Sequence, residues 1–228
     1  MNTVLVTGAN RGLGLEFSRQ YAEKGFKVIA TCRDVTKAKE LNQLAEKDNV
    51  EIKSLDICSQ SSISTLKESL ANVPIDLLIN NAGIYGGSPQ NFESCDIEQW
   101  QETLLVNAIS PIIITRSLMP ALLNSAEPKV IFITSKMGSM GDNGSGGSYI
   151  YRSSKAALNA CIKSFSIDFA DKIKTLAMHP GWVRTDMGGP NGLINATQSV
   201  SGMIETIDTL KSENSGSFVD YQGKLIPW

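Results

Sequence analysis

Short apolar runs alternate with amphipathic segments along the whole chain. Most runs are unbroken instead of alternating apolar with polar residues, which is typical of strands buried on both faces of a parallel sheet. Seven runs predict about seven strands, at residues 3–8, 27–32, 50–57, 75–80, 129–135, 173–179 and 224–226.

The segments between the runs have helical spacing. They cover residues 13–24, 36–47, 61–72, 97–124, 148–170 and 199–211. Asp34 could cap the second, and we expect the fourth to be interrupted at Pro111 and Pro120. Alternating strands and helices predict a doubly wound α/β fold, because each right-handed crossover covers a face of the sheet. With no repeat or linker, we expect one Rossmann-like domain over residues 1–228, flanked by helices on both faces.

Composition narrows the classes of function. The 228 residues are 42% hydrophobic and 19% charged, with a net charge of -2, so the chain can bury a large core but gives no electrostatic reason to bind nucleic acid or an anionic membrane. No apolar stretch reaches the ~18 residues of a membrane span, and the first residues do not resemble a secretory leader. The four cysteines are widely spaced and form no C-x-x-C pair, so we expect free thiols in a cytoplasmic protein and no metal site.

Three glycines lie directly between the first strand and the first helix. Gly8 allows the chain to turn, Gly12 removes a Cβ where a diphosphate would approach, and Gly14 allows the helix to pack close to the sheet. The helix N-terminus then offers N–H groups to the phosphates. An ordinary tight turn is the alternative, but the position favours a dinucleotide site.

The spacing T-G-x-x-x-G-x-G, at residues 7–14, resembles the short-chain dehydrogenase/reductase family. The resemblance continues in order along the chain, in Asn80-Asn81-Ala82-Gly83, Asn107, Ser135, Tyr151-x-x-x-Lys155, Pro180-Gly181 and Thr185. The run GGSYIYRSSKAALN and the ending LIPW look like the branch that contains C-factor and the sniffer-type carbonyl reductases.

The resemblance implies an oxidoreductase that moves a hydride between NADP(H) and a small carbonyl or alcohol substrate. It also implies the cofactor-binding residues, which are Gly8, Asn10, Arg11, Gly12, Leu13, Gly14, Arg33, Asp56, Ile57, Asn81, Ala82, Gly83, Tyr151, Lys155, Pro180, Gly181, Val183 and Thr185. Among them, Asp56 would contact the adenine amino group, although an Asp after a strand could equally form a turn. A homodimer or homotetramer is compatible with the family, and residues 157–165 could serve as core or as interface.

The choice between NADP and NAD depends on residues near the end of the second strand. An acidic residue there binds the ribose 2′-OH of NAD, whereas an arginine favours the phosphate of NADP. The strand-end position holds the uncharged Cys32, followed by Arg33, and Arg11 could reach the same phosphate from the glycine turn. We therefore expect NADP, with Asp34 acting as a helix cap.

Tyr151 and Lys155 lie on one helix face, because i and i+4 are neighbours. An ammonium beside a phenol should lower the phenol's pKa from about 10 and make it a better proton donor near neutral pH. Tyr149 is the rival tyrosine, but its spacing from Lys155 places it on another face.

The family resemblance gives roles to two further residues. Ser135 would hydrogen-bond the developing oxyanion, and Asn107 would help to hold a water that relays protons to Lys155. Ser139 is a less favoured alternative to Ser135, and His179, the only histidine, is expected to be a packed strand-end residue. Residues 186–197 are rich in glycine and are expected to form a mobile substrate loop.

Two other functions stay open at this point. A dinucleotide-binding signalling or regulatory protein of C-factor type, with little turnover, is the alternative to the enzyme. A nucleotide-sugar epimerase is less compatible with the length, since such enzymes usually carry a larger substrate domain.

Overall fold

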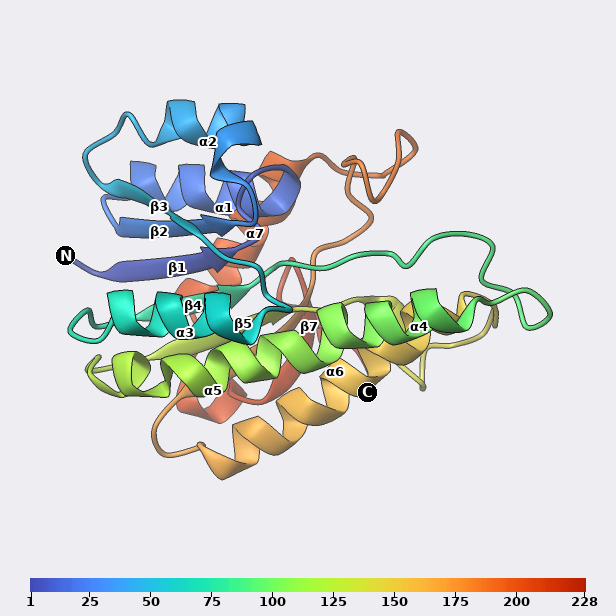
Figure 1. The fold of residues 1–228 in the computed structure, drawn as a ribbon. Helices are drawn as coiled ribbons and strands as arrows, with labels where there is room; N and C mark the ends of the chain where they lie inside the picture. Colours follow the sequence, from blue (N-terminus) through green and yellow to red (C-terminus); the bar gives the residue numbers. More distant parts are fainter.

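One sheet of seven parallel strands forms the centre of the molecule. The computed structural model describes residues 1–228, and the strands lie in the order β3-β2-β1-β4-β5-β6-β7 (Figure 1). Their bounds are β1 Thr3–Thr7, β2 Lys27–Cys32, β3 Val50–Ser54, β4 Leu77–Asn80, β5 Lys129–Ile133, β6 Lys174–His179 and β7 Ser217–Asp220. All six neighbouring pairs are parallel, so the expected doubly wound sheet is confirmed.

Helices cover both faces of this sheet (Figure 1). Their bounds are α1 Gly12–Glu23, α2 Lys39–Leu44, α3 Gln60–Ser69, α4 Ile97–Leu104, α5 Ser110–Leu123, α6 Tyr149–Asp168 and α7 Ala196–Asp208. The core on one face contains side chains of α1, α2 and α7, and the core on the other contains side chains of α3, α5 and α6. Successive strand residues enter opposite cores, since Val4 and Val6 belong to the first and Leu5 to the second. This two-sided burial explains why the strands are apolar almost throughout.

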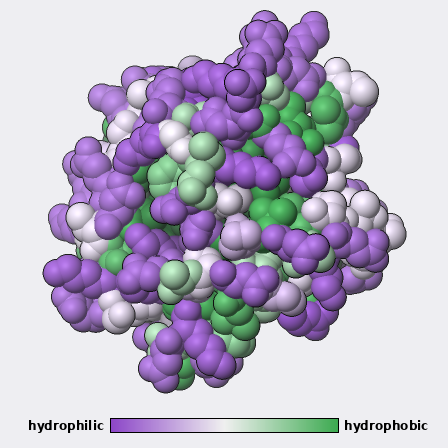
Figure 2. Space-filling view, turned by 90° about the vertical axis from the view of Figure 1, so that its left-hand side faces the viewer, coloured by the Kyte–Doolittle hydropathy of each residue, from purple (hydrophilic) through white to green (hydrophobic).

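The strand order places a switch point between β1 and β4. From β1 the chain first builds outward through β2 and β3, and then returns to place β4 on the other side of β1. Ligands of open α/β sheets bind at the carboxyl ends of strands at such a point. The glycine turn follows β1 and the segment Asn81–Gly83 follows β4, so both lie at this edge. The opposite end of the molecule, where the strands begin, is covered mainly by hydrophilic side chains with apolar ones in separate spots (Figure 2).

Several predicted elements need correction. The last strand is Ser217–Asp220, and residues 224–226 contribute only an antiparallel bridge between Leu225 and Val219. The predicted helix at 36–47 is a 3-10 turn, Val35–Lys37, followed by the short α2. Asp34 caps that 3-10 turn, since its carboxylate accepts a hydrogen bond from the Thr36 N–H.

The long helical region is interrupted differently from the prediction. A π-helical turn, Leu105–Ile109, joins α4 to α5, whereas Pro111 lies in the first turn of α5 and Pro120 lies inside it. Proline is tolerated in a first turn, because the N–H it lacks has no intrahelical partner there. Near the end of α5, Pro120 removes a single helical hydrogen bond.

The run from Ile97 to Leu123 is also long and apolar enough, by length and composition, to cross a membrane. The prediction that no stretch reaches this length therefore needs correction. The apolar residues of this run have a structural role, since Ile114, Leu118 and Leu122 pack into the core on one face of the sheet. The core helix of a soluble protein passes the same test, so this finding is weak evidence for a membrane span.

In α6, four of the five residues considered as core or interface pack in the core, and the fifth is exposed. Leu158 and Ile162 are buried in the core, and Ala157 and Phe165 pack against it. Cys161 is exposed on the outer side of the helix.

Candidate active site

The glycine turn holds the start of α1 tightly against the ends of β1 and β4. Gly8 has a φ of +68°, and a Cβ there would lie 2.9 Å from the Ala82 Cα. A Cβ at Gly14 would lie 2.2 Å from the Gly8 oxygen and 2.6 Å from the Asn81 Nδ2. The close packing predicted for Gly14 is therefore present, and Gly8 occupies a backbone conformation that favours glycine.

Hydrogen bonds fix the same region from the β4 side. The Thr7 hydroxyl accepts from the N–H groups of Asn81 and Ala82, at 3.0 and 3.1 Å. The Asn81 amide donates to the Thr7 and Gly8 carbonyls, at 2.9 and 3.2 Å. The turn and the segment after β4 are thus one rigid unit at the switch point.

The N-terminus of α1 has no capping side chain of its own. Its N-cap residue, Arg11, makes no side-chain capping bond, and no acidic residue lies in the first turn. The first N–H groups of the helix are therefore available, together with its positive dipole end, to a phosphate. These features fit the diphosphate of a dinucleotide.

At the ends of β2 and β3, two carboxylates already have hydrogen-bond partners, whereas one arginine has no ion-pair partner. The Asp34 carboxylate accepts from Thr36 and pairs with Lys37, as the capping interpretation expects. Arg33 is exposed and forms no ion pair. One Asp56 oxygen accepts from the Cys58 N–H at 2.9 Å, which is the turn-forming role, and Ile57 beside it is buried.

Ser135, Tyr151 and Lys155 meet where β5 ends and α6 begins. The Lys155 ammonium donates to the Ile133 carbonyl at 2.9 Å and lies 5.9 Å from the centre of the Tyr151 ring. Gly138 allows this approach, because a Cβ there would lie 2.7 Å from the Lys155 carbonyl carbon. The Ser135 hydroxyl accepts from the Met137 N–H at 3.1 Å, and all three side chains are buried.

Burial shifts both pKa values of this group, and not in the direction predicted for the phenol. It raises the pKa of Tyr151 to about 12, with the nearby Ser135 hydroxyl acting in the opposite direction. It lowers the pKa of Lys155 to about 8. The expectation that the ammonium brings the phenol toward neutral pH is not met, because burial is the largest cause of the shift and Lys155 is not among its causes.

Asn107 lies in the π-helical turn and is fully buried. Its amide oxygen accepts from the Ile84 N–H at 2.9 Å, and its amide N–H₂ donates to the Ile84 carbonyl at 2.8 Å. The same N–H₂ group also donates to Ser154. A Cβ on Gly83 would lie 3.0 Å from the Asn107 oxygen and 3.7 Å from the Lys155 ammonium. Asn107 thus holds the Gly83–Ile84 segment beside Lys155, and its side chain does not itself contact that ammonium.

The segment after β6 folds back onto the glycine turn. A side chain at Gly181 would collide with Ile194, 2.8 Å away, and the carbonyl of Pro180 accepts from the Ser199 hydroxyl at 2.6 Å. Thr185 lies next to Gly12, with its Cγ2 3.6 Å from the position of a Cβ there.

Residues 186–195 are hydrogen-bonded to the residues that directly precede them. The Trp182 ring donates to the Gly188 carbonyl at 2.7 Å, and the Arg184 N–H donates to the Ile194 carbonyl at 2.9 Å. Val183 is buried and forms a bridge to Ile194. The final two residues of the predicted loop, 196 and 197, belong to α7.

Comparison with known proteins decides the family. The model of the family described as short chain dehydrogenase matches residues 2–203. The chain belongs to this family. It is therefore an oxidoreductase by descent, and the order of motifs read from the sequence is that of a short-chain dehydrogenase.

Two curated members of the family are similar to it. C-signal of Myxococcus xanthus is 44% identical over 156 residues, which cover 68% of this chain and 93% of that protein. The 1-hydroxy-2-glutathionyl-2-methyl-3-butene dehydrogenase of a Rhodococcus species is 34% identical, and the match covers both chains completely.

Two solved structures extend the comparison. The carbonyl reductase Sniffer of D. melanogaster is 32% identical with a TM-score of 0.93, and all of both chains is covered. The NADPH-bound carbonyl reductase from chicken fatty liver is 34% identical with the same TM-score, covering 100% of this chain and 99% of that one. The expected resemblance to C-factor and sniffer-type proteins is confirmed.

Two residues that the sequence analysis did not select lie next to Tyr151. The Tyr85 ring lies 4.9 Å from the Tyr151 ring, centre to centre. Buried Gln90 accepts from the Tyr151 N–H at 2.9 Å and donates to the carbonyls of Tyr85 and Gly87 at 2.8 and 2.9 Å. No local signal marks Gln90, whereas the position of Tyr85 directly after the Asn-Asn-Ala-Gly motif could have drawn attention to it.

The rival residues take other roles. Ser139 donates to the Pro227 carbonyl and accepts from the Asp142 N–H, so its hydroxyl is occupied away from Tyr151. Tyr149 is 40% exposed and packs against Phe92. His179 is packed at the end of β6, and burial lowers its pKa to about 4.

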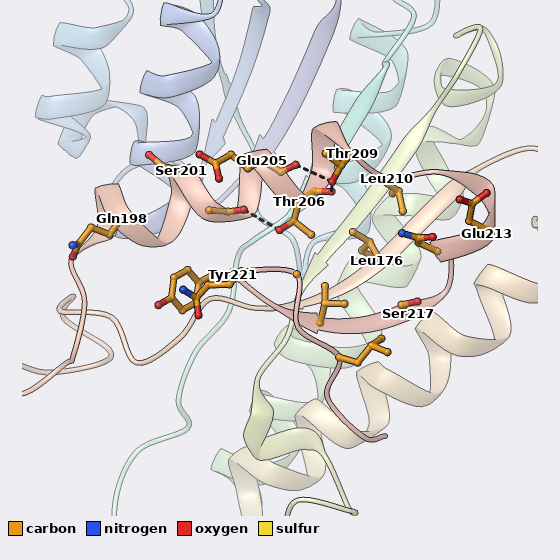
Figure 3. A pocket seen from close by; sticks show the side chains of 16 residues that line it. Leu176, Gln198, Ser201, Glu205, Thr206, Thr209, Leu210, Glu213, Ser217 and Tyr221 are labelled. Atoms are coloured by element: carbon orange, nitrogen blue, oxygen red, sulfur yellow. Dashed lines mark hydrogen bonds between the residues drawn. The ribbon is translucent and has the colours of Figure 1, made fainter.

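A hollow in the surface lies away from this site. It measures about 980 Å³ and lies between α7 and the edge strand β7, with Gln198, Glu205 and Tyr221 among its lining (Figure 3). None of the predicted catalytic residues lines it. The catalytic interpretation therefore depends on the geometry at the carboxyl ends of the strands and not on the size of a cavity.

Proposed function

We propose that the chain is an NADPH-dependent carbonyl reductase that also catalyses the reverse oxidation of the alcohol. The observation that carries this proposal is the buried group of Ser135, Tyr151 and Lys155 beside an uncapped helix N-terminus at the switch point. Solved family members with 31–34% identity, described as carbonyl reductases or as carrying NADP or NADPH, support it.

The residues present fit a dinucleotide. The backbone of the glycine turn would hold the diphosphate, with Asn10 and Leu13 inside the same turn. Glycine at position 83 leaves room between Asn107 and Lys155, where a side chain would fill the space. When bound, the cofactor supplies the hydride, and the protein orients and polarises the substrate.

Arg33 and Arg11 favour the phosphate of NADP. Arg33 forms no ion pair, and the carboxylate of Asp34 is already engaged by Thr36 and Lys37. Guanidinium groups bind phosphate with charge-assisted bonds, whereas Cys32 offers neither attraction nor repulsion.

The side chains around the carbonyl have separate tasks. Tyr151 donates its proton to the substrate oxygen, and Ser135 donates a hydrogen bond that orients this oxygen and stabilises its developing charge. Lys155 supplies the positive charge next to the phenol, and Asn107 fixes the segment on which the nicotinamide end would lie. A raised pKa keeps the Tyr151 phenol protonated at neutral pH, as a donor in the reduction requires.

The test is a panel of quinones, diketones and aromatic aldehydes assayed with NADPH and NADH side by side. We expect turnover with NADPH, and a fall of about 10²–10⁴-fold in Tyr151→Phe, the usual contribution of a general acid. Tyr149→Phe is the matched control and should retain activity, since Tyr149 is exposed and faces Phe92. Equal losses in the two variants would contradict the assignment of Tyr151.

A second function is favoured by the similarity to C-signal. A signalling protein would bind the dinucleotide tightly and show no turnover on any carbonyl. The catalytic group argues against it, because binding alone requires no buried phenol next to an ammonium. A reducing, cytoplasmic location fits the four unpaired cysteines.

A further inference from the structure

An ion pair joins two parts of the site that are 175 residues apart in the chain. The Arg11 guanidinium, in the glycine turn, donates to the carboxylate of Asp186, the first residue of the predicted substrate loop. Both side chains are exposed, at 68% and 78%. Sequence reasoning assigned Arg11 to the cofactor phosphate and gave Asp186 no role.

The contact is not a chance meeting of two flexible side chains. The neighbouring residue, Thr185, packs on Gly12 at the same place, so two consecutive residues of the loop are seated on two consecutive residues of the turn. The Ala9 N–H donates to the Thr31 carbonyl at 2.8 Å, which holds the turn beside the end of β2. The turn that carries Arg11 therefore contacts both the loop of Asp186 and the strand that leads to Arg33.

We propose that Asp186 sets the cofactor preference by competing with the 2′-phosphate for Arg11. This inference rests on the proposed NADP-dependent function. The carboxylate neutralises the guanidinium that the phosphate would bind, so the phosphate must displace it. Arg33 has no carboxylate partner, so it can bind the same phosphate without losing an ion pair.

Removal of the Asp186 charge should therefore increase the affinity for NADPH. Asp186→Asn should tighten the binding of NADPH about two- to fivefold, the range that exposed ion pairs usually span, and leave NADH unchanged. Because both groups are exposed, the gain should shrink at high ionic strength. The competition is reciprocal: a phosphate bound to Arg11 weakens the Arg11–Asp186 ion pair by as much as the ion pair weakens phosphate binding.

The experiment is a double-mutant cycle on the whole chain, read as dissociation constants by calorimetry and not as activity. Wild type, Asp186→Asn, Arg11→Gln and the double variant are titrated with NADPH and with NADH at low and high ionic strength. If Asp186 acts through Arg11, Asp186→Asn changes nothing in the Arg11→Gln background. Asp208→Asn is the matched control, since it removes a carboxylate from an exposed ion pair with Lys24 at the far end of α1.

Each outcome decides the inference separately from the proposed function. A wild type that binds NADH as tightly as NADPH would contradict the proposed cofactor. With the NADPH preference present, an unchanged NADPH affinity in Asp186→Asn would overturn the inference alone. An equal gain for both cofactors, or the same gain in the Asp208→Asn control, would overturn it as well, because the charge would then act without Arg11.

Discussion

At the scale of single residues, the chemistry depends on two buried groups whose charged forms are both disfavoured. Tyr151 has a pKa raised to about 12 and Lys155 one lowered to about 8, each mainly by burial. The phenol is therefore protonated across the physiological pH range. The Lys155 ammonium is the group of this pair that titrates close to that range. The pH dependence of reduction should follow Lys155 and not Tyr151.

We expect kcat/KM for carbonyl reduction to be constant below about pH 8 and to fall above it, as the Lys155 ammonium loses its proton. The measurement is a pH profile with saturating NADPH. In Lys155→Arg the charge persists at all these pH values, so any remaining activity should lose this decline. A wild-type profile that rises through pH 8 to 10 would contradict the assignment.

The lowered pKa of Lys155 also determines how the free energy of unfolding changes with pH. An unfolded lysine titrates near 10.5 and the folded one near 8, so between these values the unfolded chain binds more protons. The free energy of unfolding should therefore contain a contribution that rises with pH from about 8 to 10, before Tyr151 begins to act in the opposite direction. Urea titrations across this window should show the rise in wild type and not in Lys155→Met.

At the scale of elements, α6 is capped from a distance. Its preceding residue, Ser148, has a φ of +49° and makes no side-chain capping bond. Gln90 supplies the acceptors instead, its carbonyl taking the Tyr149 N–H at 3.0 Å and its side chain the Tyr151 N–H at 2.9 Å. One buried glutamine thus fixes both the first turn of the catalytic helix and the segment that carries Tyr85.

Replacing this glutamine should affect stability and turnover together. Gln90→Met keeps the size of the side chain but leaves buried N–H and carbonyl groups without partners, which costs about 1–3 kcal/mol for each such group. We expect a lower free energy of unfolding in urea and a lower kcat, because Tyr151 lies in the turn that is released. The exposed Gln101→Met in α4 is the control, and equal effects of the two substitutions would refute the capping role.

The elements show which parts of the molecule a sequence can predict. The β1–β6 strands and the site motifs follow from local signals, such as continuous apolar runs and glycines at a strand end. The last strand, Ser217–Asp220, has only two buried apolar residues in four, too few to give a pattern, whereas the apolar residues after it attracted the prediction. Gln90 and Asp186 escaped because their partners are 61 and 175 residues away, and only the completed fold brings them together.

At the scale of the whole molecule, residues 226–228 link the edge of the sheet to the catalytic side. The Ile226 N–H donates to the Phe218 carbonyl in β7 at 2.9 Å, and the Trp228 ring packs on the Phe218 ring, 5.4 Å between centres. On the other side, the Trp228 carbonyl accepts from the Gly141 N–H at 3.0 Å, and the Pro227 carbonyl accepts from Ser139. The segment that follows Ser135 is thereby held against β7.

Removing residues 226–228 should lower both stability and activity. Burial of the Ile226 side chain alone contributes about 1.5–3 kcal/mol, and the loss would free the Ser139–Gly141 segment beside the catalytic serine. Trp228→Ala, which keeps the backbone bonds, should cost less than the deletion, and Leu225→Ala should cost almost nothing, since Leu225 is 73% exposed. Urea unfolding and kcat of the three variants test this order. If the deletion lowers the free energy of unfolding and kcat no more than Leu225→Ala does, residues 226–228 do not stabilise β7 and the catalytic segment. The position of Ser135 would then depend on the packing of Gly138 against Lys155.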